Sequence, residues 1–379
     1  MKVLIAGDFA PRARLAKQIE DRKYSEVFQE DIREIIKSAD FSLVNFESPI
    51  TEKHFKPIPK CGPNLHCTYE AAEAVKYAGF TGVTMANNHI LDFGVEGLQN
   101  SVECCKAQGL DVVGVGNNLE DAEKILYIAK YGMSVAVINC CEHEFSVATQ
   151  FVSGANPLNP IKQFYAIQNA RKKADYVLVI VHGGHEHYQL PSPRMQETYR
   201  FFVDAGADVV VNHHQHCYSG YEKYKGKLIF YGLGNFCFDI SPTLKNMKWN
   251  YGYMVELIFK DSIEFKLYPY NQCGDRPIVE LLESDAFDVH IEELNSIISN
   301  EELLRARTNA YYKENVAYER SLLEPYSGRI MNRLLQWGLL PYFFKGKKML
   351  NVLNHIECES HRDKLLFVLD TLKSRICRH

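Results

Sequence analysis

The sequence predicts an α/β domain followed by a helical C-terminal region, and three observations support this fold class. Apolar runs of strand length alternate with helical patterns through the first two-thirds of the chain, as in layered α/β proteins. Polar residues directly follow several strand candidates, where such proteins place their sites. From about residue 289 onward the pattern is helical. At 379 residues the chain exceeds what one core usually organises. We therefore expect a large domain over 1–288 and a helical region over 289–379.

The elements of the expected α/β domain follow from the spacing of apolar residues. KVLIA is the first strand, DIREIIKSA is a helix, and FSLVNF is the next strand. Further strands are expected at 81–85, 111–115, 124–129, 134–140, 176–181 and 208–211, and further helices at 69–78, 95–108, 161–173 and 192–205. Strands at 227–231, 251–260 and 262–268 are expected to be antiparallel, the last two joined at Asp261.

The helical region is expected in three pieces, at 290–323, 331–340 and 361–376. Pro325 to Gly328 and Pro341 interrupt it. Its pattern leaves three roles open: a dimerisation element, a lid over the site, or a docking surface.

Composition excludes several classes of protein. The chain is 46% hydrophobic and 24% charged with a net charge of −4 and no basic block, which argues against nucleic-acid binding. No segment approaches the ~18 consecutive apolar residues of a membrane helix, so no direct membrane span is expected. The first apolar run is too short for a signal peptide, and we expect a cytoplasmic protein. The 11 cysteines include no CxxC pair, which favours free buried thiols over a disulfide framework or a catalytic cysteine.

Polar residues cluster where six of the apolar runs end. These residues are Asp8, Asn45 with Glu47, Asn87 to His89, His182, the stretch His213 to His216, and Asn235. Because open α/β sheets bind ligands beyond the carboxyl ends of their strands, the clusters are expected to converge. Their mixture of carboxylate, amide and imidazole groups suits Mn²⁺, Fe²⁺ or Zn²⁺.

The stretch VNHHQHC has a spacing that favours a metal. In extended chain, residues two apart point the same way, so His214 and His216 can reach one ion while His213 points to the opposite side. Any single cluster also has a structural explanation, since Asn88 and His89 could cap the following helix. The tyrosines Tyr311, Tyr312 and Tyr318 have the spacing of a packing surface rather than a binding site.

Six motifs together resemble one family, the CapA-like poly-γ-glutamate capsule synthesis proteins, which are related to calcineurin-like metallophosphoesterases. The motifs occur in the family's order over about residues 1–270. They are Gly7-Asp8, Asn45-Phe46-Glu47-Ser48-Pro49, Ala86-Asn87-Asn88-His89 with Asp92 and Gly94, His182-Gly183-Gly184-His185-Glu186, Asn212 to His216, and Gly232 to Asp239.

The resemblance implies a four-layer α/β/β/α sandwich with one or two divalent metal ions, Mn, Fe or Zn, at the strand ends. By similarity, the metal ligands would be Asp8, Glu47, Asn88, His182, His214 and His216. His89 would be the general acid that protonates a leaving group, with Asp92 orienting its imidazole, and Glu186 would be a ligand or a general base. Substrate contacts are expected from Asn45, His185, His213 and Asn235.

Three departures from the family pattern stand out. The first motif, Asp8-Phe9-Ala10, has no histidine, which predicts that one of two metal positions is weak or empty. Asn212 replaces a glycine and Gln215 replaces a proline, so the last histidine loop is expected to bend differently. Most CapA-like proteins are membrane-anchored, whereas no anchor is expected here.

The leading functional hypothesis is a metal-dependent hydrolase acting on a phosphoester, linked to capsule or exopolysaccharide synthesis of the poly-γ-glutamate type. One alternative is a metal-dependent amidase acting on a γ-glutamyl polymer. The other is a non-catalytic accessory protein of capsule polymer assembly. The expected partners are an anionic polymer or phosphoester substrate and a capsule-synthesis membrane complex.

Overall fold

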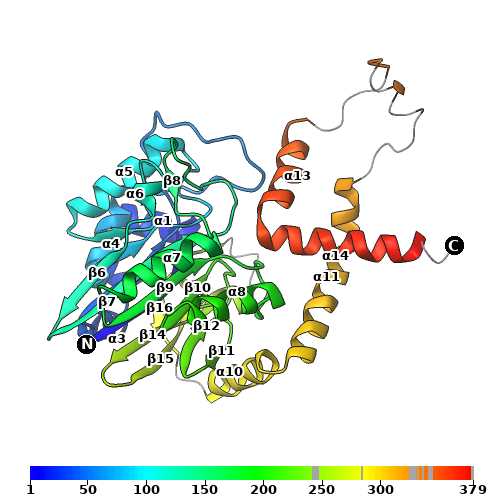
Figure 1. Ribbon diagram of the computed structural model, residues 1–379. Helices are drawn as coiled ribbons and strands as arrows, with labels where there is room; N and C mark the ends of the chain where they lie inside the picture. Colours follow the sequence, from blue (N-terminus) through cyan, green and yellow to red (C-terminus); the bar gives the residue numbers. More distant parts are fainter. Residues whose placement is uncertain are drawn as a thin grey trace.

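Two β-sheets at the centre of the molecule carry helices on their outer faces (Figure 1). The computed structural model describes residues 1–240, 247–282, 285–323 and 345–376, together with the short stretches 330, 333–334 and 337–339. The elements below belong to these residues.

The first sheet has the strand order β16-β15-β14-β1-β2-β3-β4, with β13 also paired to β1. Its strands are β1 (Lys2–Phe9), β2 (Phe41–Phe46), β3 (Gly82–Thr84), β4 (Asp111–Val113), β13 (Asn235–Cys237), β14 (Tyr251–Phe259), β15 (Ile263–Gln272) and β16 (Val279–Leu281). Strands β1 to β4 are parallel, and β14 to β16 add an antiparallel half.

The second sheet has the order β11-β12-β10-β9-β7-β6. Its strands are β6 (Leu126–Lys130), β7 (Met133–Cys141), β9 (Tyr176–His182), β10 (Val209–His213), β11 (Tyr221–Tyr224) and β12 (Lys227–Phe230). The four central strands β7, β9, β10 and β12 are parallel. A small ladder joins β5 (Val115–Gly116) to β8 (Gly154–Ala155).

Helices cover both outer faces. The first sheet is covered by α1 (Ala13–Glu20), α2 (Tyr24–Val27), α3 (Glu30–Ser38), α4 (Glu70–Ala78) and α5 (Gly94–Ala107). The second is covered by α7 (Pro160–Arg171) and α8 (Pro193–Asp204), and short helices occur as α6 (Leu119–Ala122) and α9 (Met247–Asn250). Helix α8 begins where Ser192 accepts a hydrogen bond from the Met195 amide and a proline takes the first turn, a favourable start for a helix.

Strand β1 shows why the layers form. Val3 and Ile5 belong to the core between the two sheets, whereas Leu4 and Ala6 belong to the core beneath the helices. Successive side chains of a strand point to opposite faces, so a fully apolar run requires cover on both. The predicted four-layer α/β/β/α sandwich with a helical appendage is confirmed.

The C-terminal helices stand beside the sandwich (Figure 1). They are α10 (Asp285–Ile298), α11 (Glu301–Leu323), α13 (Lys347–Glu357) and α14 (Glu359–Ile376). The helix expected over 290–323 is in fact two, because the chain breaks at Ser299 and Asn300, and the Asn300 side chain accepts a hydrogen bond from the Leu303 amide. Half of the helix expected over 331–340 lies outside the described residues. The domain division at residue 288 stays a prediction.

None of the helices in the described part of the chain is both long enough and apolar enough to cross a bilayer.

Candidate metal centre

Side chains from the ends of five strands and from the start of a sixth meet in one buried cluster between the two sheets. Asp8 comes from β1, Asn45 and Glu47 from the end of β2, and His182 from the end of β9. The others are Asn88 after β3, Asn235 at the start of β13, and His213, His214 and His216 at and beyond the end of β10. All of these side chains are buried, as expected where parallel strands end together.

The carboxylates of Asp8 and Glu47 are held by the Asn45 amide. Its Nδ2 donates to Asp8 Oδ1 at 2.8 Å and lies 3.5 Å from Glu47 Oε2. The Asn45 Oδ1 accepts a hydrogen bond from Asn87 at 3.3 Å. Asn45, expected to contact substrate, therefore has every polar atom engaged inside the cluster.

Three imidazoles face the same carboxylates. His182 Nε2 is 3.8 Å and His216 Nε2 is 3.6 Å from Glu47 Oε1. His214 Nδ1 is 3.1 Å from His182 Nε2, and the Asn88 Oδ1 is 3.1 Å from the same nitrogen. Three sets of donor atoms in this cluster each lie within 4.8 Å of one another: Glu47 with His182 and His214, Asp8 with Glu47 and His216, and Glu186 with His214 and His216.

The donor set fits a divalent cation. Glu47 Oε1 is buried and accepts no hydrogen bond within the described residues, although two imidazole nitrogens face it. A buried carboxylate oxygen without a partner is costly, and a cation among these donors would remove that cost. Carboxylate, imidazole and amide oxygen are ligands that Mn²⁺, Fe²⁺ and Zn²⁺ accept.

The pKa shifts have the same origin. Burial, followed by the negative charge of Asp8, raises the pKa of Glu47 well above its usual value. Burial lowers the pKa of His182 well below its usual value, and the charge of His214 lowers it further. Burial would also lower the pKa of His216, but the carboxylates of Glu47 and Asp8 raise it to about 10. Two buried carboxylates side by side thus call for positive charge between them.

The histidine loop after β10 has an unusual backbone. His214 has φ 87° and His216 has φ 54°, a left-handed region that non-glycine residues rarely adopt. Asn235 supports the second histidine, with its Oδ1 2.9 Å from His216 Nδ1 and its Nδ2 donating to the His216 carbonyl. Such strain persists only where surrounding contacts hold it. Asn235, expected to contact substrate, therefore positions His216.

Asn212 and Gln215, the two departures from the family pattern, tie this loop to its neighbours. The Asn212 side chain donates to the carbonyls of Gly183 and Tyr231 and accepts from Tyr199 at 2.7 Å. Gln215 Nε2 donates to the Tyr188 carbonyl at 2.8 Å. These side chains fix the loop through hydrogen bonds.

His89 lies beside the cluster in a chain of charged groups. Its Nδ1 is 2.7 Å from Asp92 Oδ2, which places Asp92 where the sequence predicted, beside the imidazole. Asp92 also accepts from the Leu65 amide at 2.6 Å and forms an ion pair with Lys60. Burial, followed by the positive charge of Lys60, lowers the pKa of His89, which favours a neutral imidazole.

Comparison with known proteins identifies the chain. The family model described as "Bacterial capsule synthesis protein PGA_cap" matches residues 2–240. The chain belongs to this family. The predicted resemblance is confirmed.

Two relatives show the extent of the similarity. "Capsule biosynthesis protein CapA" of Bacillus anthracis is 35% identical over 247 residues, which cover 63% of this chain and 60% of that protein. "PGA biosynthesis protein CapA" of Bacillus subtilis (strain 168) is 34% identical over 237 residues, covering 62% of each. This chain thus matches about 60% of the length of these curated relatives. A solved phosphatase of Mycoplasma pneumoniae has 15% identity and a TM-score of 0.43, covering 76% of this chain and 98% of that one.

The residues matched by the PGA_cap family include every predicted metal ligand. Three other predicted site residues, Glu186, His185 and His213, lie around the cluster in different ways. Glu186 is exposed, with its carboxylate near His214 and His216. His185 is buried and turned away, with its Nε2 2.8 Å from the Tyr312 hydroxyl on α11. His213 Nδ1 lies 3.5 Å from Asp8 Oδ1, and neither of its ring nitrogens forms a hydrogen bond within the described residues. The substrate roles of Asn45, His185, His213 and Asn235 stay predictions.

Sequence reasoning missed two cations in the PGA_cap domain. Lys60 is a buried lysine whose Nζ lies 3.1 Å from His89 Nδ1, and it comes from a loop without regular structure. Arg12 lies over the Phe238 ring at 6.0 Å, has no ion pair within the described residues, and has its pKa lowered by burial. The Phe238 ring in turn packs on His216 at 5.1 Å. The proximity of Arg12 to the Gly7-Asp8 motif was the one sequence signal that pointed to it.

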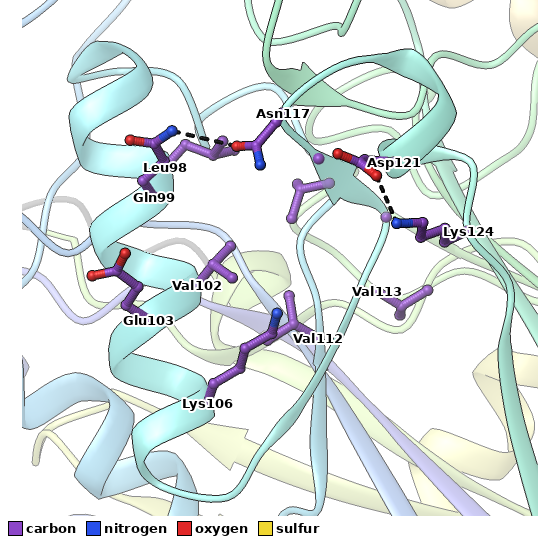
Figure 2. Close-up of a pocket in the computed structure, with 13 residues that line it drawn as sticks. Leu98, Gln99, Val102, Glu103, Lys106, Val112, Val113, Asn117, Asp121 and Lys124 are labelled. Carbon is purple, nitrogen blue, oxygen red and sulfur yellow. Dashed lines mark hydrogen bonds and ion pairs between the residues drawn. The ribbon is translucent and has the colours of Figure 1, made fainter.

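A separate cleft of about 510 Å³ lies at the outer edge of the first sheet, between α5 and the chain around β4 and β5 (Figure 2). Its side chains include Gln99, which donates to Asn117, and Lys124, which pairs with Asp121. None of the predicted site residues lines it. The cleft is therefore distinct from the strand-end cluster.

Proposed function

We propose that the protein is a divalent-metal-dependent hydrolase of phosphoesters that acts in the synthesis of a capsule polymer. The observation that carries this proposal is the buried oxygen and nitrogen donor set around Glu47 Oε1, which accepts no hydrogen bond from the described residues, with the His89–Asp92 pair beside it. The link to capsule polymer synthesis rests on the family and on the printed names of the two Bacillus relatives.

Asp8, Glu47, Asn88, His182, His214 and His216 would hold the metal, which we expect to be Mn, Fe or Zn. A bound ion of this kind polarises a phosphoryl oxygen and lowers the pKa of water from 15.7 to about 7. The chain's contribution is to present these donors from rigid strand ends and to exclude bulk water, since the side chains are buried. One or two ions are compatible with the overlapping donor sets.

His89 would protonate the departing oxygen. Because Asp92 accepts a hydrogen bond from Nδ1, the acid is the protonated imidazole, whose second proton sits on Nε2 and is the one available for donation. Lys60 forms an ion pair with Asp92 and thereby helps to hold that side chain against Nδ1. Help of this kind from a positioned histidine typically contributes about 10²–10⁴-fold in rate.

An anionic substrate has a candidate partner in Arg12. This guanidinium is half-buried and free of carboxylates within the described residues, and it lies one ring away from His216. Guanidinium groups bind phosphate in a two-pronged geometry. We therefore add Arg12 to His213 among the residues expected to meet substrate, while Glu186 would be a metal ligand or a general base.

The test combines metal content with turnover. Protein purified without chelator is assayed for metal and for hydrolysis of aryl phosphates and of γ-linked glutamyl peptides. We expect His89→Ala to lower turnover by about 10²–10⁴-fold with metal content nearly unchanged, and His214→Ala/His216→Ala to lose the metal. Full activity of His89→Ala would remove the acid assignment, and cleavage of the peptides alone would favour the amidase.

A second candidate function is that of an accessory protein of polymer assembly. The burial of the cluster's side chains favours it. Every predicted ligand is buried, and His89 is only 7% exposed, so a large polymer has little access as the chain stands. Metal-loaded protein that cleaves neither panel yet retains poly-γ-glutamate on a column would support this function. A capsule-synthesis membrane complex as partner and a cytoplasmic location stay predictions.

A further inference from the structure

A second group of metal-binding side chains lies where the C-terminal helices meet the sandwich. It consists of Glu144 from the loop after β7, Cys358 between α13 and α14, and His361 in the first turn of α14. One donor atom of each lies within 4.8 Å of the others. Cys358 and His361 lie outside the part of the chain that the family model matches. We call this group the tail cluster.

A buried side chain in the tail cluster has an unmet polar atom. Asn354 of α13 places its Nδ2 3.2 Å from Glu144 Oε1 and 2.7 Å from His361 Nδ1. Its Oδ1 is buried and has no hydrogen-bond partner within the described residues, and the whole residue is 4% exposed. A buried amide oxygen left without a partner is costly.

Rotating the Asn354 amide by half a turn exchanges these two atoms. The oxygen would then face the Glu144 carboxylate, a repulsive contact in the absence of a cation. With a cation among them, carboxylate oxygen, amide oxygen, imidazole nitrogen and thiolate sulfur become four donors around one point. The cation would thus satisfy the Asn354 oxygen and accommodate the Glu144–His361 approach of 3.7 Å.

The side chains at the tail cluster suit a metal ion that binds sulfur ligands. Cys358 is buried, and its Sγ lies 3.8 Å from Glu142 Oε2. Cys61 is a further half-buried thiol, and burial, followed by the charge of Glu144, raises its pKa. Cys61 belongs to the loop between β2 and α4, which extends toward α13 (Figure 1). Thiolate, imidazole and carboxylate together are typical zinc ligands, usually in tetrahedral geometry.

The polar contacts around the tail cluster show what the ion would do. Arg194 pairs with Glu142 and Asp363, both at 2.7 Å, and Ser360 donates to Glu142 at 2.7 Å. These bonds already dock α14 on the sandwich. An ion shared by Glu144 and the two residues of the tail would add a bond between the same surfaces, and metal binding at such a junction contributes directly to folding.

We propose that Glu144, Cys358 and His361, with Asn354 as the fourth donor, bind one zinc ion that fastens the C-terminal helices to the sandwich. This site is independent of the proposed hydrolase function. Its thiolate also distinguishes it from the strand-end cluster, whose predicted ligands are oxygen and nitrogen alone.

Cobalt(II) binding to the full chain tests the proposal. Metal-free protein is titrated with Co²⁺ and followed by the charge-transfer absorption that a thiolate ligand gives and that oxygen and nitrogen ligands do not. We expect the band in the wild type, its loss in Cys358→Ser and its weakening or loss in His361→Ala. Cys104→Ser, a half-buried thiol on α5 that contacts Asn100, is the matched control and should keep the band.

The result separates the two metal sites. His214→Ala/His216→Ala should keep the thiolate band, so failure of the hydrolase proposal leaves this one intact. Absence of the band in the wild type, or an unchanged band in Cys358→Ser, would overturn the zinc site. Should Cys358→Ser fail to fold, X-ray absorption of zinc-loaded wild type decides, because a sulfur neighbour at about 2.3 Å is required.

Discussion

Gly7 shows how one residue shapes the strand-end cluster. A Cβ atom at this position would lie 1.9 Å from the Gly234 carbonyl oxygen. Directly after it, the Asp8 amide donates to that same oxygen at 3.1 Å, and the pairing of β1 with β2 shifts register between Ala6 and Asp8. The missing side chain therefore lets β13 approach β1 and brings Asn235 opposite Asp8.

We predict that Gly7→Ala destabilises the fold and weakens metal binding. Overpacking usually costs about 1–3 kcal/mol, and here the obstacle is backbone, so the cost should reach the upper end. Gly132→Ala is the control, because Gly132 has φ 72° with no atom near its missing Cβ and should cost only the left-handed strain of about 1–2 kcal/mol. Urea unfolding and metal titration measure both effects. Equal metal affinity in the two variants would contradict the role given to Gly7.

Lys60 contacts both the proposed general acid and its carboxylate partner, so its removal should lower both stability and turnover. It is buried against Asp92 and His89 and lies 4.8 Å from the Phe145 ring. Lys60→Met leaves Asp92 a buried charge without its cation, and breaking such a pair typically costs about 3–5 kcal/mol. We expect lower unfolding free energy and lower turnover with metal content retained, and no change for the exposed Lys56→Met. Unaltered turnover in a stable Lys60→Met protein would show that Asp92 orients His89 unaided.

At the scale of elements, α8 carries two arginines with different tasks. Arg194 bridges Glu142 of the sandwich to Asp363 of α14, whereas Arg200 pairs with Glu222 of β11. Burial would lower the pKa of Arg194, but the carboxylates of Glu142 and Asp363 raise it. Burial would raise the pKa of Glu142, but the charge of Arg194 lowers it to about 2. The docking of α14 thus depends on a buried ion pair.

We predict that Arg194→Met loosens the C-terminal helices. Two carboxylates lose their cation, and the cost of an uncompensated buried charge is about 3–5 kcal/mol. Hydrogen exchange should rise in α13 and α14, while Arg200→Met should leave their exchange as in the wild type. Exchange that rises equally in both variants would mean that α14 is held by other contacts.

At the scale of the whole molecule, much of the sandwich could be predicted because its strands are buried on both faces. Short apolar runs such as FSLVNF are readily recognised as buried strands. The ends of these strands locate Asp8, Glu47 and His182. Helix α1 was missed because it is short and only Leu15 and Ile19 of ARLAKQIE are large apolar residues, and β13 because it has only three residues. The side-chain partners of the loops could not be predicted, since His185 meets Tyr312, 127 residues further along the chain.

Removal of the metal is expected to lower the stability of the whole fold. Asp8 and Glu47 are buried side by side, so a cation that binds only the folded chain should stabilise it by about 2.7 kcal/mol at 100 times its dissociation constant. We expect chelation to lower the unfolding midpoint and Mn²⁺ or Zn²⁺ to restore it. His214→Ala/His216→Ala should gain little from added Mn²⁺. A wild type whose midpoint ignores both chelator and metal would contradict the candidate metal centre.

The contacts of α14 also set an order for synthesis. Glu142 accepts its hydrogen bond from Ser360, 218 residues later, and His143 meets Glu359 across 216 residues. Translation therefore completes the strands of both sheets, the last of which is β16, well before these partners exist. The hydrogen bond between Glu142 and Ser360 can form only after translation has passed residue 360.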